Sequence, residues 1–325
     1  METVIAPVDD DSLHRAAEVL RAGGLVAFPT ETVYGLGANA LDAAAVSRIF
    51  AAKGRPATNP VIVHVADSSD VALVAAAWPD TAAQLAQRFW PGPLTLVVPK
   101  SASVPDIVTA GGPTVAIRCP DHPVARALIR TAGVPVAAPS ANRSTELSPT
   151  RAEHVLKSLK GRIPLILDGG PCPGGIESTV VDVTAARPRI LRPGLITAAM
   201  LEAVCGPVDV GAALSGVARS PGLMAKHYSP RTPVVLASTA AEAEQLCRQC
   251  QQAGLRPIVV SCEAGSGQCR LPNDPARYAR ELYATLHELD DGRFDRLIVQ
   301  LPPDRPEWAA VRDRLLRAAA KNENG

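Results

Sequence analysis

The chain has 325 residues, enough for two domains with separate cores, because a typical domain holds about 150 residues. Hydrophobic residues make up 47% and charged residues 20% of the sequence, which is typical of a globular protein and excludes a disordered or collagen-like chain. Lys and Arg total 33 against 32 Asp and Glu, so the net charge of +1 offers no broad positive surface for a nucleic acid.

Membrane and disulfide signals are absent from the sequence. No apolar run reaches the roughly 20 residues that cross a bilayer, and no basic-then-apolar leader opens the chain. Seven irregularly spaced cysteines do not suggest a secreted disulfide framework. We therefore expect a cytoplasmic protein with reduced thiols. Cys247 and Cys250, with Cys262 and Cys269, only loosely resemble a zinc site, and we expect no metal site there.

Apolar strands alternate with amphipathic helices over the first 197 residues. Asp11 or Ser12 is expected to cap a first helix, and Asp42 is expected to cap a second. Buried strands are predicted at 25–28, 61–65, 94–98, 114–118, 134–138, 164–168, 178–183 and 189–192. This alternation favours an α/β sheet covered by helices.

Two further helices are expected in this region, one from about His122 and one after Pro149. Regular apolar spacing then lapses between residues 205 and 232, a stretch that we interpret as a linker or functional loop. From Pro233 onward, strands and helices alternate again. The sequence therefore predicts a second, smaller α/β unit.

The segment PTETVYGLGANA, residues 29–40, is expected to form a polar loop that lines a small-molecule pocket. Gly35 and Gly37 fit the dinucleotide pattern G-x-G-x-x-G/A loosely. The acidic residue that should follow about 20 positions later is missing, so nicotinamide binding is rejected.

Two cations close a helix in KGRPATNPVIVHV. Lys53 and Arg55 suit a phosphate chain, because charge-assisted contacts to phosphate are strong. Alternatively, they only complement the negative end of the helix dipole. Asn59 and His64 flank the following turn. Considered by itself, His64 is more typical of a structural histidine in a strand than of a ligand-binding residue.

Arg118 ends an apolar strand, the place where open α/β sheets present ligand-binding groups. It could hold a carboxylate or form a surface salt bridge. Ser178, in a glycine-rich loop, and Arg192 add another hydroxyl and another cation, which turn chemistry alone could also explain.

The segment APSANRSTELSPT lies between a predicted strand and a predicted helix. Ser140, Asn142 and Ser148 could form an anion cradle at the start of that helix. Alternatively, Ser148 is only the N-cap, with Pro149 in the first turn.

The sequence resembles the threonylcarbamoyl-AMP synthase family in the order and the residues of nine segments. They are PTETVYGLG, KGRPATNPVIVHV, FWPGPLTLVV, TVAIRCP, PVAAPSAN, SPT, ESTVVDV, LRPG and SPGLMAKHYSP. The resemblance implies a twisted α/β, YrdC-like catalytic domain at residues 10–197 with a concave substrate surface. It further implies a linker at 198–232 with a KHY loop that closes over the site. A smaller, Rossmann-like α/β domain is implied at 233–320.

The family's activity is implied with its fold. Such an enzyme joins L-threonine, bicarbonate or CO2, and ATP into threonylcarbamoyl-AMP and releases pyrophosphate. The product passes to tRNA-modifying partner proteins that form threonylcarbamoyladenosine. Mg²⁺ is expected with ATP, and a weak contact with tRNA is possible in this family.

The resemblance also assigns site residues. Threonine and carbamate binding falls to Thr32, His64, Arg118, Ala138 and Ser178. ATP binding falls to Lys53, Arg55, Asn59, Thr114, Ser140, Asn142, Ser148, Arg192, His227 and Tyr228. Lys53 and Arg55 are expected to act in catalysis by offsetting phosphate charge, and Arg118 to take the carboxylate. Either His227 or Tyr228 is expected to reach the nucleotide.

Two other functions are compatible with parts of the sequence. One is a YrdC-like RNA-binding module without enzyme activity, which the near-neutral charge and the few aromatic residues (three Trp, four Tyr and four Phe) disfavour. The other is carbamoyl adenylation in hydrogenase maturation. That multidomain protein carries acylphosphatase and zinc-finger segments, which this sequence lacks in recognisable form.

Overall fold

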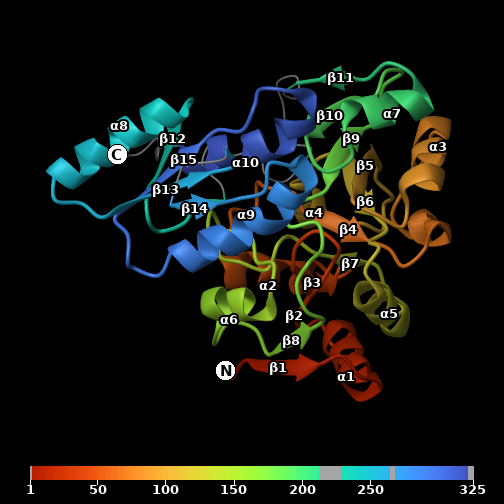
Figure 1. The fold of residues 1–325 in the computed structure, drawn as a ribbon. Coiled ribbons are helices and arrows are strands. Elements are labelled where there is room, and N and C mark those ends of the chain that lie inside the picture. The colour runs from red at the N-terminus through yellow and green to blue at the C-terminus, as the bar shows by residue number, and fades with distance from the viewer. Residues whose placement is uncertain (1, 212–227, 264–267, 321–325) are drawn as a thin grey trace. The chain divides into compact units, whose positions relative to one another are not determined.

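The computed structural model describes residues 2–211, 228–263 and 268–320 (Figure 1). The chain divides into two compact units. The first holds residues 1–144, 149–173 and 177–223, and the second holds 145–148, 174–176 and 224–325. Each unit is α/β, which confirms the predicted fold class. No helix among the described residues is long and apolar enough to span a membrane.

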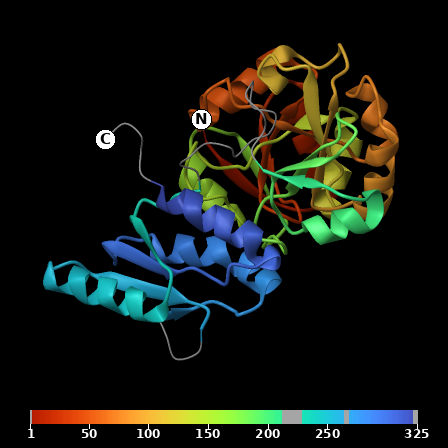
Figure 2. The ribbon, with the colours of Figure 1, turned by 90° about the horizontal axis from the view of Figure 1, so that it is seen from above.

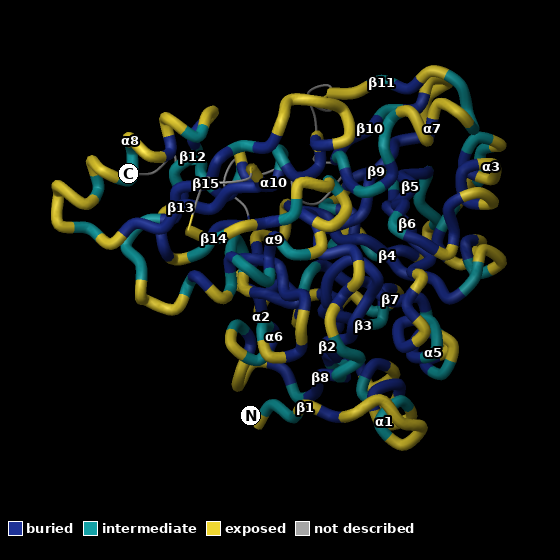
Figure 3. The backbone as a smooth tube through the Cα atoms, in the orientation of Figure 1, coloured by how far each residue is buried: buried dark blue, intermediate teal, exposed yellow. Residues whose placement is uncertain are grey.

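A mixed, eleven-stranded sheet forms the first unit. Its strands are β1 (Val4–Pro7), β2 (Val26–Phe28), β3 (Gly35–Asn39), β4 (Ile62–His64), β5 (Leu94–Pro99), β6 (Thr114–Arg118), β7 (Val136–Ala137), β8 (Leu165–Asp168), β9 (Thr179–Asp182), β10 (Arg189–Arg192) and β11 (Asp209–Val210). They lie in the order β1-β8-β2-β3-β7-β4-β6-β5-β9-β10-β11. Most central strands are buried, as Figure 3 shows in dark blue.

Helices cover both faces of this sheet. They are α1 (Asp10–Arg21), α2 (Ala43–Lys53), the 3₁₀ helix η1 (Ser68–Leu73), α3 (Asp80–Phe89), α4 (Asp106–Thr109), α5 (Pro123–Ala132), α6 (Ala152–Leu159) and α7 (Ala198–Cys205). Apolar residues of α2, α3, α6 and α7 share one core, and those of α1 and α5 share another. Helix α7 and strand β11 occupy the first part of the segment interpreted as a linker.

Strand β3 is the main difference from the predicted elements. Residues 35–39 were expected in a loop, yet they pair antiparallel with β2. A glycine is needed there because a Cβ on Gly37 would lie 2.7 Å from Phe28 and 2.8 Å from Val136. The loop prediction was wrong because glycine normally signals a turn, whereas here it permits close packing on an aromatic ring.

Two predicted helix starts also differ. Asp9 caps α1 by accepting a hydrogen bond from the Ser12 backbone N–H, so neither Asp11 nor Ser12 is the cap. Helix α6 begins at Ala152, and its N-cap is Arg151, three residues beyond Ser148. The interpretation of Ser148 as an N-cap is therefore wrong. Asp42 caps α2 as predicted.

The second unit has a four-stranded parallel sheet. Its elements are β12 (Val234–Ala237), α8 (Ala240–Gln252), β13 (Pro257–Ser261), β14 (Cys269–Arg270), α9 (Pro275–Leu289), β15 (Arg296–Gln300), the 3₁₀ helix η2 (Pro306–Trp308) and α10 (Ala309–Ala319). The strand order is β12-β15-β13-β14, with α8 on one face and α9 and α10 on the other (Figure 2). Cys247 and Cys250 lie on α8, packed against this unit's core.

Candidate active site

Polar side chains gather where four neighbouring strands of the first unit begin or end. His64 ends β4 and is paired with Arg118, which ends the parallel strand β6. Because β5 runs antiparallel to β6 and parallel to β9, Thr95 and Ser178 lie near the same edge. An apolar band of strand residues continues this face: Ile62, Val97, Ala116, Val180 and Leu191.

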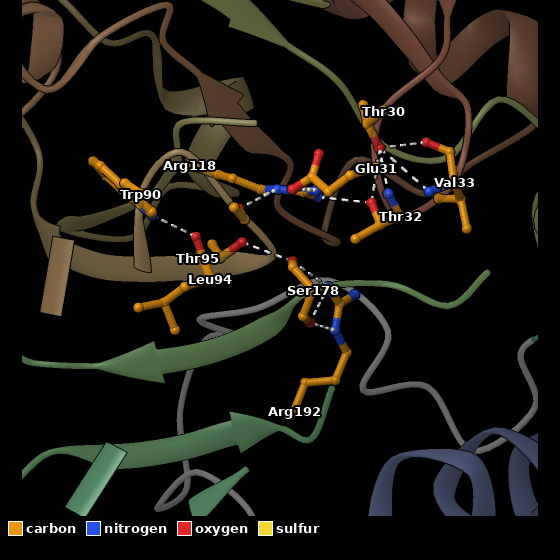
Figure 4. Close-up of polar contacts among 11 residues, drawn as sticks. Thr30, Glu31, Thr32, Val33, Trp90, Leu94, Thr95, Arg118, Ser178 and Arg192 are labelled. Carbon is orange, nitrogen blue, oxygen red and sulfur yellow. Dashed lines mark hydrogen bonds and ion pairs between the residues drawn. The ribbon is translucent and has the colours of Figure 1, made fainter. Parts of the chain in front are cut away.

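Arg118 is the centre of the polar cluster (Figure 4). Its Nη1 donates a 2.9 Å hydrogen bond to Thr32 Oγ1, and its Nε donates to the Gly92 carbonyl at 3.3 Å. Its Nη2 lies 2.5 Å from Glu31 Oε1, and the two side chains are only 4% and 11% exposed. Arg118 is therefore part of a buried ion pair and does not form a surface salt bridge.

The loop after β2 is held by the Thr30 hydroxyl, which accepts hydrogen bonds from the backbone N–H groups of Thr32 and Val33. The same hydroxyl donates to the Val33 carbonyl at 2.7 Å and lies 2.8 Å from Thr32 Oγ1. This local turn fixes the backbone on both sides of Glu31. The two side chains that contact Arg118 are thus carried by one ordered turn.

Ser178 joins strand β5 to the cation of β10. Its hydroxyl lies 2.8 Å from Thr95 Oγ1, and Arg192 Nη2 donates to this hydroxyl at 3.1 Å and to the Ser178 carbonyl at 2.9 Å (Figure 4). All three side chains are buried. The structure thus brings Ser178 and Arg192 together, as one polar network with Thr95.

His64 is a buried, neutral imidazole. Burial, and then the positive charge of Arg118, lower the pKa of His64 to about 3. Its Nδ1 atom is buried and accepts no hydrogen bond from the described residues. The Phe28 ring lies perpendicular to the imidazole ring, with ring centroids 6.4 Å apart. Backbone groups of Val136 and Ile62 act in the opposite direction and raise the pKa, but burial and Arg118 outweigh them, so His64 stays uncharged.

The lowered pKa of His64 predicts a loss of stability in acid. Between pH 6.5 and about 3 the unfolded chain protonates this histidine and the folded chain does not, so stability falls as the pH falls. The contribution approaches about 1.4 kcal/mol for each pH unit. Urea unfolding at several pH values should show a smaller pH slope for His64→Gln than for wild type. Equal slopes would contradict the neutral imidazole.

Lys53 anchors the loop that follows β7. Its Nζ donates to the backbone carbonyls of Ser140 at 2.6 Å and Asn142 at 2.5 Å, and lies 3.5 Å from Asn142 Oδ1. Lys53 is only 2% exposed. The structure therefore brings three of the predicted nucleotide-binding residues together, with the ammonium group positioning the loop from the end of α2.

Arg55 organises its own loop in the same way. Its Nε donates to the Asn59 carbonyl at 3.3 Å and its Nη2 to the Pro60 carbonyl at 2.9 Å. Ala138 is buried beside β4, where its backbone N–H donates to the Ile62 carbonyl. Thr114 starts β6 on the face that carries Arg118, about 13 Å along the strand from it.

Ser148 and Tyr228 belong to the second unit. Ser148 is fully buried, and its carbonyl lies 3.1 Å from His287 Nε2. Tyr228 has a positive φ of 61° and is buried between the Tyr283 ring, 5.9 Å away, and the Arg314 guanidinium, 5.3 Å away. His227 lies outside the described residues.

Sequence reasoning did not assign three members of the cluster: Glu31, Gly92 and Thr95. Thr95 could have been found as a lone polar residue inside the apolar run LTLVV. Glu31 carried a weaker signal, an acidic residue beside Thr32 in a loop already identified as unusual. Gly92 contributes only its backbone carbonyl, which no residue-type pattern reveals.

No group of three or more His, Cys, Asp or Glu side chains that could hold a metal ion occurs among residues 2–211, 228–263 and 268–320. The cations and hydroxyls of the cluster instead suit anionic ligands. Arginine forms bidentate pairs with carboxylate or phosphate, and buried hydroxyls fix their orientation. The cluster can therefore bind a carboxylate beside an apolar surface.

Two family models match the chain. The first, described as telomere recombination, covers residues 18–194. The second, described as the threonylcarbamoyl-AMP synthase C-terminal domain, covers residues 196–320. Together they account for both units of the structure.

Curated relatives and solved structures agree with these matches. The threonylcarbamoyl-AMP synthase of Bacillus subtilis is 44% identical, over 96% of this chain and 94% of its own. That of Pyrococcus abyssi is 40% identical, over 96% of this chain and 95% of its own. The crystal structure of P. abyssi Sua5 with L-threonine superposes with a TM-score of 0.92 at 39% identity, covering 98% of each chain.

Proposed function

The chain belongs to the threonylcarbamoyl-AMP synthase family, and from that premise we infer that it converts L-threonine, bicarbonate and ATP into threonylcarbamoyl-AMP, pyrophosphate and water. The observation that carries this proposal is the buried guanidinium of Arg118, hydrogen-bonded to Thr32 and paired in register with the neutral His64. This arrangement suits the carboxylate of an amino acid. A crystallised relative that is 39% identical binds L-threonine, which supports the same ligand here.

The chemistry has two parts. The threonine nitrogen first forms a carbamate with the carbon of CO2 or bicarbonate. A carbamate oxygen then attacks the α-phosphorus of ATP, and pyrophosphate leaves in line. Because this attack needs alignment and charge stabilisation more than covalent catalysis, the residues act mainly by positioning.

The roles of individual residues are part of the proposal. Arg118 and Thr32 would hold the threonine carboxylate, and Ser178 would orient the carbamate. Lys53, Arg55 and Arg192 would offset negative charge on the phosphates. In support, all three cations are buried, where charge acts more strongly than in water.

Mg²⁺ is proposed to enter with ATP. Magnesium keeps most of its ligands as water and phosphate oxygens, so it needs few protein carboxylates. That preference fits a pocket whose polar groups are mostly cations and hydroxyls. The metal would supply charge neutralisation on the triphosphate.

The fate of the product belongs to the same proposal. A mixed anhydride of a carbamate and AMP is reactive in water, so a partner enzyme must take it up and transfer the threonylcarbamoyl group to adenosine in tRNA. We propose that the protein acts in the cytoplasm beside that partner. The modified tRNA is the expected end product.

Pyrophosphate release tests the proposed function. The purified protein is given Mg²⁺ and ATP, with L-threonine and bicarbonate supplied or withheld in turn. Release is expected only when both are present, because the carbamate is the nucleophile. Pyrophosphate release that does not depend on threonine would contradict the proposal. So would the absence of pyrophosphate release with all substrates present.

A further inference from the structure

The Arg118 cluster contains hydrogen-bond acceptors that the protein leaves unused. Both carboxylate oxygens of Glu31 and the Nδ1 atom of His64 are buried and have no hydrogen-bond partner among the described residues. Glu31 Oε1 meets Arg118 Nη2 as a charge contact at 2.5 Å, and this Nη2 atom also lacks a hydrogen bond. Buried polar groups are usually bonded, so such a group calls for an explanation, such as a ligand that completes it.

The donor and acceptor types of these groups indicate what kind of ligand would complete them. A carboxylate only accepts hydrogen bonds, and a neutral imidazole has one accepting nitrogen. A guanidinium nitrogen only donates. The cluster therefore offers accepting atoms on Glu31 beside a donating atom on Arg118. A molecule that carries an ammonium group next to a carboxylate matches both, which is the backbone of a free α-amino acid.

Charge balance leads to the same ligand. Glu31 and Arg118 form a buried pair with opposite charges, and such a pair is favourable only when further hydrogen bonds satisfy both partners. A zwitterion laid alongside the pair, head to tail, supplies these bonds without adding net charge. Its carboxylate meets Arg118 and its ammonium meets Glu31.

We propose that Glu31 receives the α-ammonium group of threonine and takes its proton, so that the amine becomes a nucleophile for carbamate formation. The step is a single proton transfer. An N–H bond of the ammonium breaks, its electron pair stays on nitrogen, and an O–H bond forms on the Glu31 carboxylate. Glu31 is then a neutral acid and threonine a neutral amine, ready to attack the carbon of CO2. This inference rests on the proposed function.

The other titratable groups around Glu31 do not change their protonation state between pH 7 and 9. Burial lowers the pKa of His122, and it raises the pKa of Cys119 to about 11 and that of Cys172 to about 12. His64 stays neutral in the same range, because burial and the charge of Arg118 lower its pKa. Between pH 7 and 9, a change in the ratio of variant rate to wild-type rate therefore does not arise from His122, Cys119, Cys172 or His64.

The pH profile of Glu31→Gln tests the proton transfer. The variant keeps the size of the side chain but can accept no proton, so it depends on threonine that is already deprotonated in solution. Its pyrophosphate release relative to wild type should rise by about tenfold from pH 7 to 8 and then less steeply toward pH 9, where free threonine is largely deprotonated. Using the ratio cancels the effect of pH on the supply of CO2. A ratio that stays constant with pH would overturn the proposal.

Binding tests the ammonium contact without turnover. Calorimetry compares L-threonine with 2,3-dihydroxybutanoate, in which a hydroxyl replaces the ammonium. Wild type should bind threonine about 10- to 100-fold more tightly, because a hydrogen bond to a charged group is strong. Glu31→Gln should lose most of this preference. A preference that survives the substitution would contradict the contact.

Two variants keep the result interpretable. Glu31→Asp retains a carboxylate, so it should be slower than wild type but show a constant rate ratio across pH. Asp168→Asn makes the same carboxylate-to-amide change at a residue that accepts hydrogen bonds from Tyr34 and Gly170, and its ratio should also stay constant. If wild type itself releases no pyrophosphate, the proposed function fails, while the binding comparison still decides the role of Glu31.

Discussion

Replacing Arg118 with Met is expected to weaken threonine binding strongly and to destabilise the first unit at the same time. Loss of the charge-assisted contacts to the carboxylate should weaken threonine binding by about 2–4 kcal/mol. ATP binding should change little, because the predicted nucleotide contacts lie on other residues. Calorimetry with each ligand separates the two effects, and equal losses for both would contradict the assignment.

The stability loss has its own physical cause. Arg118 and Glu31 are 4% and 11% exposed, so removing the guanidinium leaves a buried carboxylate without its counter-charge. Breaking a buried pair in this way costs about 3–5 kcal/mol of unfolding free energy. Urea unfolding of the variant at pH 7 measures this loss.

The double variant Arg118→Met with Glu31→Gln separates stability from function. With both charges removed, most of the lost unfolding free energy should return, because uncharged replacements of a buried pair are often tolerated. Threonine binding should not return. A double variant as unstable as Arg118→Met would show that packing, and not the buried charge, accounts for the loss.

Gly194→Ala is expected to reduce pyrophosphate release by about 100-fold through a shift of the Ser178 backbone. A Cβ on Gly194 would lie 2.3 Å from the Thr179 backbone nitrogen and 2.7 Å from the Ser178 carbonyl carbon. Backbone atoms cannot rotate away as a side chain can, so the start of β9 must move. This movement would displace Ser178 from Thr95 and Arg192.

Steady-state kinetics with each substrate varied measures this effect. The stability cost of the added methyl group should be about 1–3 kcal/mol. Gly206→Ala is the matched control, because a Cβ there meets no atom within 4 Å and only the positive φ of 76° is strained. Its backbone, with a φ of 76° and a ψ of −164°, lies in a region that only glycine adopts readily, so Gly206→Ala should be destabilised by about 1–3 kcal/mol and keep its rate. Comparable loss of activity in both variants would contradict a steric effect on Ser178.

The sequence predicted those parts of the fold that rest on apolar runs. The strands around Val63, Leu96, Ile117 and Ile166 were predicted because consecutive buried residues leave little choice of structure. Strand β3 was missed because Gly37 is required by the Phe28 ring, which comes from another strand. Such a requirement depends on a neighbour in space, which no local pattern contains.

The candidate site likewise combines residues that the local sequence identifies with residues that only the fold brings together. Arg118 could be placed at a strand end from the sequence, because a cation after an apolar run marks that position. Its partner Glu31 lies 87 residues earlier, and only the folded chain brings them together. Ser148 illustrates the opposite error. Its local sequence resembles a helix cap, yet α6 begins at Ala152.

The most direct test of the central claim follows the carbon of bicarbonate. The wild-type protein is incubated with Mg²⁺, ATP, L-threonine and ¹³C-bicarbonate, and the nucleotide products are analysed at once by mass spectrometry. One pocket that joins threonine to ATP through a carbamate predicts threonylcarbamoyl-AMP carrying a single ¹³C atom. An adenylate of threonine without this carbon, or no adenylate at all, would contradict the account.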